Sequence, residues 1–413
     1  MQIKSFLLPI VAALLTSVSA ADSSNKCSFS KTSITEATAI TQLNACSTLD
    51  GEISISGSGI GSIDLSSVKV LKAKLSILNS PSIVSLNFNQ LQNITGALVI
   101  NNATQLNSID LTQLTNVETL QLVSLPSFAI LNLNQGVQKA GTIVLSDTAL
   151  TNLNGLASFN TIDSININNN KNISKIEFSD LQTVTDSLIL SFNNDDAEVK
   201  LDSLKWAGNL TIQDVSSIQA SNLTSVNGSL LISYNTFDEL EFPNLKSVGN
   251  SMQIFAHDEL TKISFPKLSE LDGELEMFNN TQLEEIDFGN LTTIKGAVTI
   301  SGPFDNLTME NLKLVSGDFQ VNSTSDKFDC SAFDKLHEKG KIEGHNYVCT
   351  HPANPSSSSK SGSSTQTGKS DSKSSDGSSS SNSSSSSKKG AGNVLVVPGM
   401  VLTTALGVLL ALI

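Results

Sequence analysis

Two pairs of carboxylates are the residues of this 413-residue chain best suited to catalysis. Asp195 and Asp196 are adjacent, and Glu274 and Glu276 lie two positions apart. Hydrolysis of a glycosidic bond uses two carboxyl groups about 5–10 Å apart in a cleft. However, Asp195 and Asp196 follow two asparagines, where acidic residues are ordinary turn formers. Glu274 and Glu276 flank an apolar residue of a predicted strand and should face solvent. A β-helix enzyme acting on polysaccharide is therefore the alternative hypothesis, with no catalytic residue assigned.

The four histidines and the few aromatic residues do not form a recognisable site. His257 is expected at a corner of the fold, and His337, His345 and His351 near the C-terminal end of the repeats. All four are predicted to lie on the surface, because no Cys–His or Ser–His–Asp order stands out. Trp206 is expected to pack in the core, and one Trp and two Tyr give weak support for a lectin-type groove. The sequence predicts no metal, no cofactor and no small-molecule substrate.

Composition argues against a nucleic-acid-binding protein. The chain carries 25 basic and 39 acidic residues, a net charge of −14, and every basic residue is lysine. Nucleic-acid binding needs a positive surface, usually with arginine. Charged residues make up only 15% of the chain and aromatic residues 5%. A weakly charged polar surface around an aliphatic core is typical of a secreted glycoprotein.

The N-terminal segment, residues 1–20, predicts secretion. Lys4 is followed by an apolar stretch and then by small residues, with Val18 and Ala20 at the −3 and −1 positions of a cleavage site. Cleavage is expected after Ala20, or one residue later. The apolar stretch is too short to span a bilayer.

The C-terminal segment, residues 390–413, predicts a glycosylphosphatidylinositol (GPI) attachment signal. Residues 394–413 are uncharged and follow a group of small residues, so the lipid should be added at Gly390, with Asn393 as the alternative. A retained transmembrane helix is the competing interpretation. The serine-rich residues 353–389 cannot bury enough apolar surface to fold, which indicates a glycosylated stalk.

A repeat fills residues 51–325 between these segments. Pairs of apolar residues two positions apart recur 20 to 23 residues from one another. The pairs are Ile53/Ile55, Leu75/Ile77, Leu98/Ile100, Leu120/Leu122, Ile143/Leu145, Ile165/Ile167, Leu188/Leu190, Leu210/Ile212, Leu230/Ile232, Met252/Ile254, Leu275/Met277, Val298/Ile300 and Phe319/Val321. Such spacing predicts one short strand per repeat at these pairs, with a corner on either side.

Each repeat has a regular internal pattern. Gly, Asp or Asn precedes the apolar pair by two positions in most repeats, which we interpret as a corner with positive φ. A second polar corner follows the pair, with Asn79, Asn102, Asp147, Asn169, Asp214 and Asn279 in matching places. Three short strands and three corners per repeat predict an all-β parallel β-solenoid of about 13 coils with a pitch of about 22 residues. A leucine-rich-repeat horseshoe is less favoured, because no helical face of matching length is present.

Four cysteines bound the repeats. Cys27 and Cys46 precede the first coil, Cys330 and Cys349 follow the last, and each pair is separated by 19 positions. The two ends of a long stack are too far apart for cross-pairing, so local disulfides are expected. They would hold an N-terminal cap at residues 21–50 and a C-terminal cap at residues 326–352. A zinc site is less favoured, because the histidines are not clustered.

Eleven N-x-S/T sequons predict N-glycosylation in a secreted chain. They are Asn93, Asn102, Asn172, Asn209, Asn222, Asn227, Asn279, Asn290, Asn306 and Asn322 in the repeats, and Asn382 in the stalk.

The pattern L-x-x-V-x-G-x-L-x-I is clearest in residues 223–232 and 291–300. With the signal peptide, the stalk and the C-terminal signal, it resembles the fungal GPI-anchored cell-wall organisation proteins, the "extracellular mutant" and sporulation-specific group. Their repeats are similar to receptor L domains. The resemblance implies a non-catalytic glycoprotein of the plasma membrane and wall, needed for wall integrity. In pathogenic yeasts it also implies a part in adhesion and host interaction. It implies attachment to the membrane through GPI and contact with wall glucan or mannoprotein.

Overall fold

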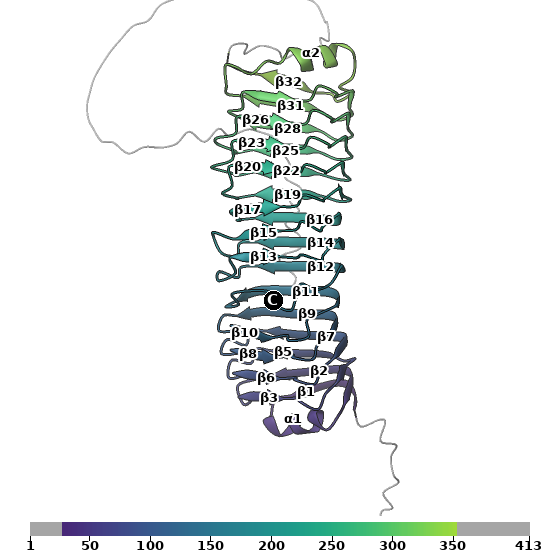
Figure 1. Ribbon diagram of the computed structural model, residues 1–413, viewed down its shortest axis with the longest axis vertical. Coiled ribbons are helices and arrows are strands. Elements are labelled where there is room, and N and C mark those ends of the chain that lie inside the picture. Colours follow the sequence, from purple (N-terminus) through teal and green to yellow (C-terminus); the bar gives the residue numbers. More distant parts are fainter. Residues whose placement is uncertain (1–26, 353–413) are drawn as a thin grey trace, which may run out of the picture. The chain divides into compact units, whose positions relative to one another are not determined.

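The apolar repeat folds as a parallel β-solenoid in the computed structural model, which describes residues 27–352 (Figure 1). The predicted apolar pairs are buried and lie in register from coil to coil. Leu75 pairs with Leu98, and Ile77 with Ile100. Because alternate strand residues face opposite sides, one period-2 pair per coil makes a continuous apolar ladder. The predicted all-β solenoid of about 13 turns and about 22 residues per turn is confirmed.

One long parallel sheet of 21 strands follows the stack from end to end. Its strands are β1 (Ser28–Ile34), β2 (Thr48–Ser56), β4 (Val70–Leu71), β5 (Lys74–Leu78), β7 (Asn93–Asn101), β9 (Asn116–Leu125), β11 (Lys139–Thr148), β12 (Thr161–Asn168), β14 (Thr183–Ser191), β16 (Trp206–Gln213), β18 (Ser225–Val226), β19 (Leu230–Ser233), β21 (Ser247–Val248), β22 (Met252–Phe255), β24 (Glu270–Leu271), β25 (Leu275–Phe278), β27 (Thr293–Ile294), β28 (Val298–Gly302), β30 (Leu314–Val315), β31 (Phe319–Ser323) and β32 (Tyr347–Thr350). We call this the long sheet.

Three-residue strands on another side of the coils form three short sheets. They are β3 (Ser62–Asp64), β6 (Ser85–Asn87), β8 (Ser108–Asp110) and β10 (Ile130–Asn132), then β13 (Lys175–Glu177), β15 (Glu198–Lys200) and β17 (Ser217–Gln219), then β20 (Glu239–Glu241), β23 (Lys262–Ser264), β26 (Glu285–Asp287) and β29 (Asn306–Thr308). Three strand segments per coil were predicted, but two of them belong to the same long sheet, and they merge into one strand in coils such as that of β7.

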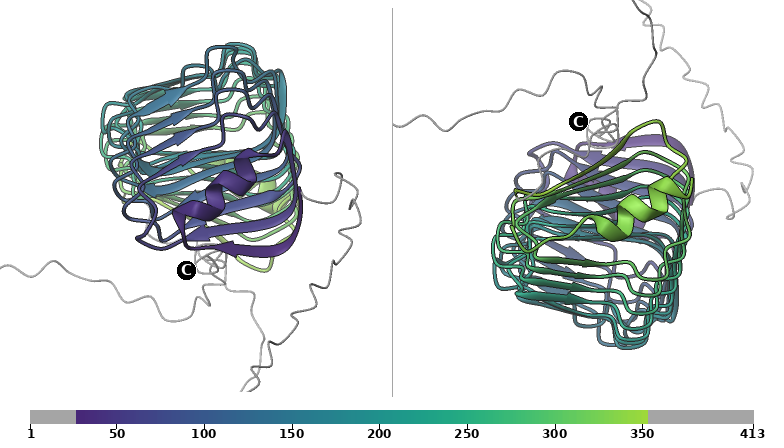
Figure 2. Two further views of the ribbon diagram at one scale, coloured as in Figure 1. Left: turned by 90° about the horizontal axis from the view of Figure 1, so that it is seen from below. Right: turned by 90° about the horizontal axis from the view of Figure 1, so that it is seen from above.

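Two helices lie in the described range, one at each end of the stack (Figure 2). Helix α1 (Ala37–Asn44) lies at the N-terminal end, and α2 (Ser331–Glu338) at the C-terminal end. Disulfides Cys27–Cys46 and Cys330–Cys349 close these two regions, as predicted. Open strand edges invite association with other chains, so covered ends protect the solenoid.

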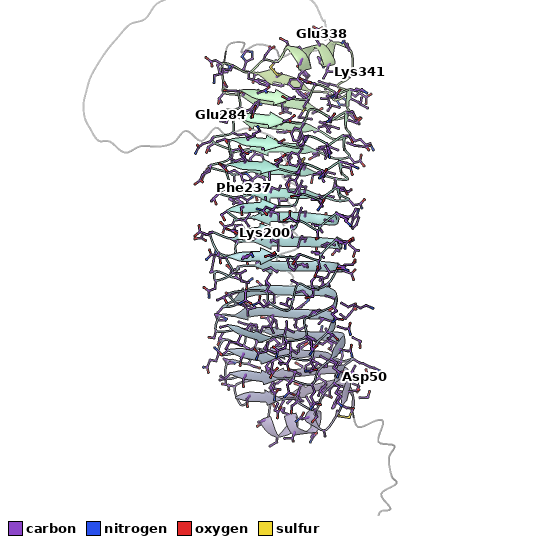
Figure 3. The ribbon with its side chains drawn as sticks, viewed as in Figure 1. Asp50, Lys200, Phe237, Glu284, Glu338 and Lys341 are labelled. Atoms are coloured by element: carbon purple, nitrogen blue, oxygen red, sulfur yellow. A yellow bond between two sulfur atoms is a disulfide. The ribbon has the colours of Figure 1, made fainter. Side chains whose placement is uncertain are left out.

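The interior contains aliphatic and phenylalanine side chains arranged in rows, while polar side chains cover the outside of every coil (Figure 3). Phe265 stacks between Phe242 and Phe288, with ring centroids 5.5 and 5.4 Å apart. Since identical positions in successive coils are neighbours, each buried ring packs on the next one, and adjacent coils depend on each other for their core.

The two predicted corners have different physical causes. The polar corner after the apolar pair is confirmed: Asn102 and Asn279, for example, both have φ of 55°. The glycine corner before the pair was explained wrongly, because among its predicted members only Gly51 has positive φ. At Gly296 a Cβ atom would lie 2.5 Å from the carbonyl carbon of Gly273 in the preceding coil. Glycine is needed there for close approach of two backbones, not for a left-handed conformation.

Candidate functional site

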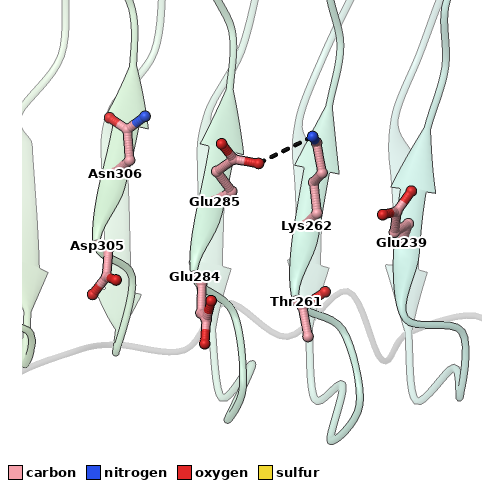
Figure 4. A pocket seen from close by; sticks show the side chains of 7 residues that line it. All are labelled: Glu239, Thr261, Lys262, Glu284, Glu285, Asp305 and Asn306. Carbon is pink, nitrogen blue, oxygen red and sulfur yellow. Dashed lines mark ion pairs between the residues drawn. The ribbon is translucent and has the colours of Figure 1, made fainter.

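A hollow of about 400 Å³ lies on the outer face of the short sheet that contains β20, β23, β26 and β29 (Figure 4). Each coil contributes one or two side chains to it, in two rows. The lining residues are Glu239, Thr261, Lys262, Glu284, Glu285, Asp305 and Asn306. A groove with several acidic residues is what a polysaccharide-cleaving solenoid would present, so its electrostatics test the enzyme hypothesis.

Ion pairs hold the charges of this hollow in place. Lys262 Nζ lies 3.0 Å from Glu285 Oε2, and Lys327 Nζ lies 2.6 Å from Asp305 Oδ2. The hydrogen bond with Glu285 raises the pKa of Lys262, and those from Lys327 and Ser325 lower the pKa of Asp305. A catalytic acid needs a carboxyl whose pKa is raised so that it keeps a proton. The interactions at Lys262 and Asp305 instead favour the charged forms of both side chains, and the lowered pKa of Asp305 is the opposite of what a catalytic acid needs.

The carboxylate pair Asp195 and Asp196 forms a turn, as the turn-former interpretation expects. The amide of Asp196 donates a hydrogen bond to Asn194 Oδ1 at 3.0 Å. The Asp195 side chain is 89% exposed and lies 3.6 Å from Lys171 Nζ. Water therefore surrounds Asp195, and an exposed ion pair such as the one between Asp195 and Lys171 contributes little to stability.

Asp214 was not considered as a site residue from the sequence, where it was assigned only to a polar corner. Its side chain is 24% exposed and lies 3.8 Å from the same Lys171 Nζ. Burial raises the pKa of Asp214, nearby Asp195 raises it further, and Lys171 lowers it. The fold thus brings Asp195 and Asp214 to the two sides of one lysine. The sequence signal that could have identified Asp214 is an acidic residue at a corner position that Phe192 and Tyr234 occupy in the two neighbouring coils.

The second carboxylate pair, Glu274 and Glu276, faces outward as expected. Glu274 is exposed, and Glu276 is half-buried on the outer surface of β25. Glu276 Oε2 accepts a hydrogen bond from Gln253 Nε2 at 2.6 Å, one coil away. This contact between coils gives Glu276 a structural role.

The prediction that His257 lies on the surface is wrong, because it is fully buried. It belongs to a row of buried polar side chains at the corner after the long sheet, in which four coils have asparagine. The asparagines are Asn170, Asn193, Asn235 and Asn280. Asn193 Nδ2 donates to the carbonyl of Ile167 in the preceding coil at 3.0 Å. We call these five residues the polar ladder, and its hydrogen bonds satisfy backbone groups that the corner leaves buried.

His257 fits the polar ladder only as a neutral ring. Its Nε2 lies 3.1 Å from Asn235 Nδ2, which is a donor, and its Nδ1 lies 2.9 Å from Asn280 Oδ1, which is an acceptor. The neutral tautomer with the proton on Nδ1 satisfies both contacts. Burial lowers the pKa of His257 to about 4, although Asn280 and Asp258 act in the opposite direction.

Other sequence predictions about single residues have mixed outcomes. Trp206 is half-buried and faces outward. Ala207 takes the buried position, because this coil has one residue fewer than both neighbouring coils between that position and the apolar pair. The core assignment of Trp206 is therefore wrong. His345 is exposed as predicted, whereas His337 and His351 are half-buried near the C-terminal disulfide. His337 stacks on Tyr347 with ring centroids 4.3 Å apart.

Nine of the ten sequon asparagines in the described range are exposed, and Asn93 is half-buried. Asn93 Oδ1 accepts a hydrogen bond from Asn116 Nδ2 at 2.6 Å. Asn382, the cleavage site after Ala20 and the attachment site at Gly390 or Asn393 lie outside the described residues. Within residues 27–352, no group of three or more His, Cys, Asp or Glu residues could hold a metal ion, and no helix could cross a membrane.

Comparison with known proteins adds a family to this geometry. The chain is 99% identical over 413 residues to "Cell surface GPI-anchored protein ECM33" of Candida albicans, covering all of both chains. It is 34% identical over 322 residues to "Cell wall mannoprotein PST1" of Saccharomyces cerevisiae, covering 76% of this chain and 72% of that one. It is 31% identical over 352 residues to "Cell wall protein ecm33" of Schizosaccharomyces pombe, covering 84% and 82%. No family model and no solved structure matches.

Proposed function

The chain belongs to the family of fungal GPI-anchored cell-surface and cell-wall proteins, and from this premise we propose that it is a non-catalytic glycoprotein that organises the cell wall. It would act at the outer face of the plasma membrane and in the wall. Signal cleavage after Ala20 and lipid attachment at Gly390, or at Asn393, would bring it there. The printed names of its relatives support this location.

The observation that carries the proposal is the exposure of the sequon asparagines on a closely stacked solenoid. Nine exposed acceptors are fixed to coils that share one core. Glycans on such a scaffold would point away from it in several directions. A carbohydrate-coated protein held at the membrane by GPI can contact wall glucan or mannoprotein, and its outer surface can take part in adhesion to a host.

The charge arrangement of the described carboxylates supports a non-catalytic role. The pKa of Asp305 is lowered, Asp195 is largely exposed, and Glu276 is hydrogen-bonded between coils. Only Asp214 has both partial burial and a raised pKa. A β-helix enzyme acting on wall polysaccharide is therefore the weaker candidate, and Asp214 is the residue on which it would depend.

Gene deletion and complementation test the proposal. Deletion should cause hypersensitivity to wall-binding dyes and a disordered outer mannoprotein layer. Rescue should need the signal peptide, the solenoid and the attachment signal. It should survive the double variants Asp195→Ala with Asp196→Ala and Glu274→Ala with Glu276→Ala, and also Asp214→Ala.

Surface display separates the two explanations of a failed rescue. If a carboxylate variant is displayed at the normal level and does not restore the wall, the non-catalytic proposal is wrong. Release of the protein from intact cells by a GPI-cleaving phospholipase, compared with release by glucanase, would measure its distribution between membrane and wall.

A further inference from the structure

Four aromatic side chains form a row along the edge of the long sheet. Phe192 and Tyr234 are 42% and 50% exposed, and Phe255 and Phe278 are half-buried at the ends of β22 and β25. The ring centroids of Phe192 and Tyr234 are 6.1 Å apart, and those of Tyr234 and Phe255 are 5.8 Å apart. Phe255 and Phe278 stack at 4.8 Å. We call these four residues the aromatic row.

The backbone positions of Phe192 and Tyr234 are unusual for aromatic residues. They occupy the polar corner after the apolar pair, with φ of 53° and 61°. Asn79, Asn102 and Asn169 occupy the same position in other coils. Asparagine adopts this left-handed conformation readily, whereas a bulky residue there is an outlier. The corner imposes this conformation in most coils, but it does not require an aromatic side chain, and strain of this kind is frequent at binding sites.

The surface beside the aromatic row is almost free of charge. Before the apolar pairs the long sheet carries charged outward residues, among them Glu52, Lys74 and Glu118. The residue inside each apolar pair and the residue after the pair, from β2 to β28, hold one charged side chain, Glu276. The others are Ser54, Ser56, Ser76, Leu78, Val99, Asn101, Gln121, Val123, Val144, Ser146, Asn166, Asn168, Ile189, Ser191, Thr211, Gln213, Leu231, Ser233, Gln253, Phe255, Phe278, Thr299 and Ser301. We call this surface the neutral face, and none of its residues is a sequon asparagine.

Hydrogen-bonding groups lie next to the rings. Gln213 Nε2 donates to Ser233 Oγ at 2.8 Å, and Gln253 Nε2 donates to Glu276 Oε2 at 2.6 Å. The side-chain carbonyls of both glutamines are positioned by these contacts. Asp214 lies at the corner between those of Phe192 and Tyr234, one coil from each. Rings flanked by amide, hydroxyl and carboxylate groups are suited to a ligand that is apolar on its faces and hydroxylated at its rim.

We propose that the aromatic row and the adjacent amide and hydroxyl groups of the neutral face bind a single strand of neutral β-linked glucan. In β-linked glucose the hydroxyl groups are equatorial, which leaves C–H faces that pack on the electron-rich faces and edges of aromatic rings. Mannose has an axial hydroxyl that interrupts one such face. The inference rests on the proposed function in one respect: the proposed function places the protein in the wall, where it meets glucan.

Charge and area favour this ligand over other occupants. A protein with net charge −14 repels anionic polymers, while a neutral surface neither attracts nor repels a neutral glucan. A stable protein dimer buries roughly 800 Å² per partner with an apolar centre. Four rings that are at most half exposed offer less apolar area than that. A linear polymer, by contrast, can follow a narrow row from coil to coil.

The test uses the full-length protein, purified with its anchor in detergent, and a fluorescent soluble linear β-1,3-glucan. The double variant Phe192→Asn with Tyr234→Ser places at each corner a residue type that other coils have there, as at Asn79 and Ser124, and creates no new sequon. It should weaken glucan binding at least tenfold without lowering the thermal unfolding midpoint. Ile130→Asn removes an equally exposed apolar side chain from β10, 48% exposed, and should leave binding unchanged.

Three results would overturn the inference. The first is a wild-type protein that does not bind the glucan, or a double variant that binds within twofold of it. The second is competition by soluble α-mannan as strong as that by unlabelled glucan. The third is self-association, measured by sedimentation velocity, that the double variant loses while glucan binding is absent, which would assign the row to a second copy. None of these affects the complementation test, so the proposed function can fail or stand separately.

Discussion

The neutral face of the long sheet and the outer face of the short sheets lie on two sides of the same coils and differ sharply in charge. Among the outward residues of the short strands, half are charged: Asp64, Asp110, Lys175, Glu177, Glu198, Lys200, Glu239, Glu241, Lys262, Glu285 and Asp287. On the neutral face only Glu276 is charged. Because both sides bury the same kind of apolar ladder, the difference is not required by the core. It indicates that one side keeps the protein soluble and leaves the other available for a neutral partner.

The two sides also differ in how closely the coils approach. At the glycine corner beside the long sheet, Gly273 and Gly296 bring backbones of adjacent coils together so closely that a Cβ atom does not fit. The short strands instead form three separate sheets. The long sheet therefore determines the stacking of the coils, and the short-strand side can vary in loop and charge.

A charge in the core of the long sheet should have the largest effect. Leu230 is fully buried, and Leu230→Asp leaves a carboxylate without a partner in the apolar ladder, at a cost of several kcal/mol. Since neighbouring coils share this core, we expect no secretion, measured by immunoblotting of the wall and membrane fractions. Glu276→Ala on the outer surface of the same sheet is the control and should be secreted normally. Equal secretion of both variants would show that the assigned faces are wrong.

A methyl group at the glycine corner should have the next largest effect. Gly296→Ala places a Cβ atom against the backbone of Gly273, which should destabilise the fold by about 1–3 kcal/mol. Gly61 leads into β3 on the short-strand side and has open space around the same position. Gly61→Ala should therefore leave the thermal unfolding midpoint unchanged. A similar midpoint for both variants would contradict the difference in stacking between the two sides.

The polar ladder beside the long sheet should make stability depend on pH. Burial lowers the pKa of His257 to about 4 from an ordinary value of 6.5. Between these values the unfolded chain binds a proton that the folded chain excludes, so stability is complete above pH 6.5 and falls as the pH approaches 4. The loss at pH 5 should be about 2 kcal/mol relative to pH 8.

Replacing His257 by asparagine, the residue that both neighbouring coils have there, tests this pH dependence. His257→Asn should raise the unfolding midpoint at pH 5 and have little effect at pH 8, measured by circular dichroism at both pH values. An unchanged difference between the two pH values would mean that His257 does not titrate as its burial predicts.

Loss of one charge from the short-strand side should have the smallest effect. Lys262 and Glu285 form an exposed ion pair between β23 and β26, with atoms 3.0 Å apart. Exposed pairs contribute little to stability and are screened by salt. We expect Lys262→Met to leave the unfolding midpoint unchanged in physiological salt. A clear decrease would mean that the short-strand side helps to hold the coils together.

Much of the fold could be predicted because a repeated pattern determines it locally. The apolar pairs identified the long sheet, and asparagines such as Asn102 and Asn279 identified the left-handed corner. Both signals are contained in a few consecutive residues. The cysteine spacing likewise identified both disulfides, because a long stack keeps its ends apart.

The single residues that were missed depend on neighbours one coil away, about 20–23 positions distant in the sequence. His257 looked like a surface corner residue until it was found between Asn235 and Asn280. Asp214 acquired its raised pKa from burial and from the carboxylate of Asp195.

The sequence by itself determined the coil. The period, the buried pairs and the polar corners follow from local alternation of apolar and polar residues, and the closed ends follow from the cysteine spacing. Only the tertiary structure decided which side chains of different coils meet, and this set the close approach at Gly296, the neutral state of His257 and the contact between Phe192 and Tyr234. The physical reason is that stacking places equivalent positions side by side. A shift of one residue at a single corner exchanges inward and outward positions, as at Trp206 and Ala207.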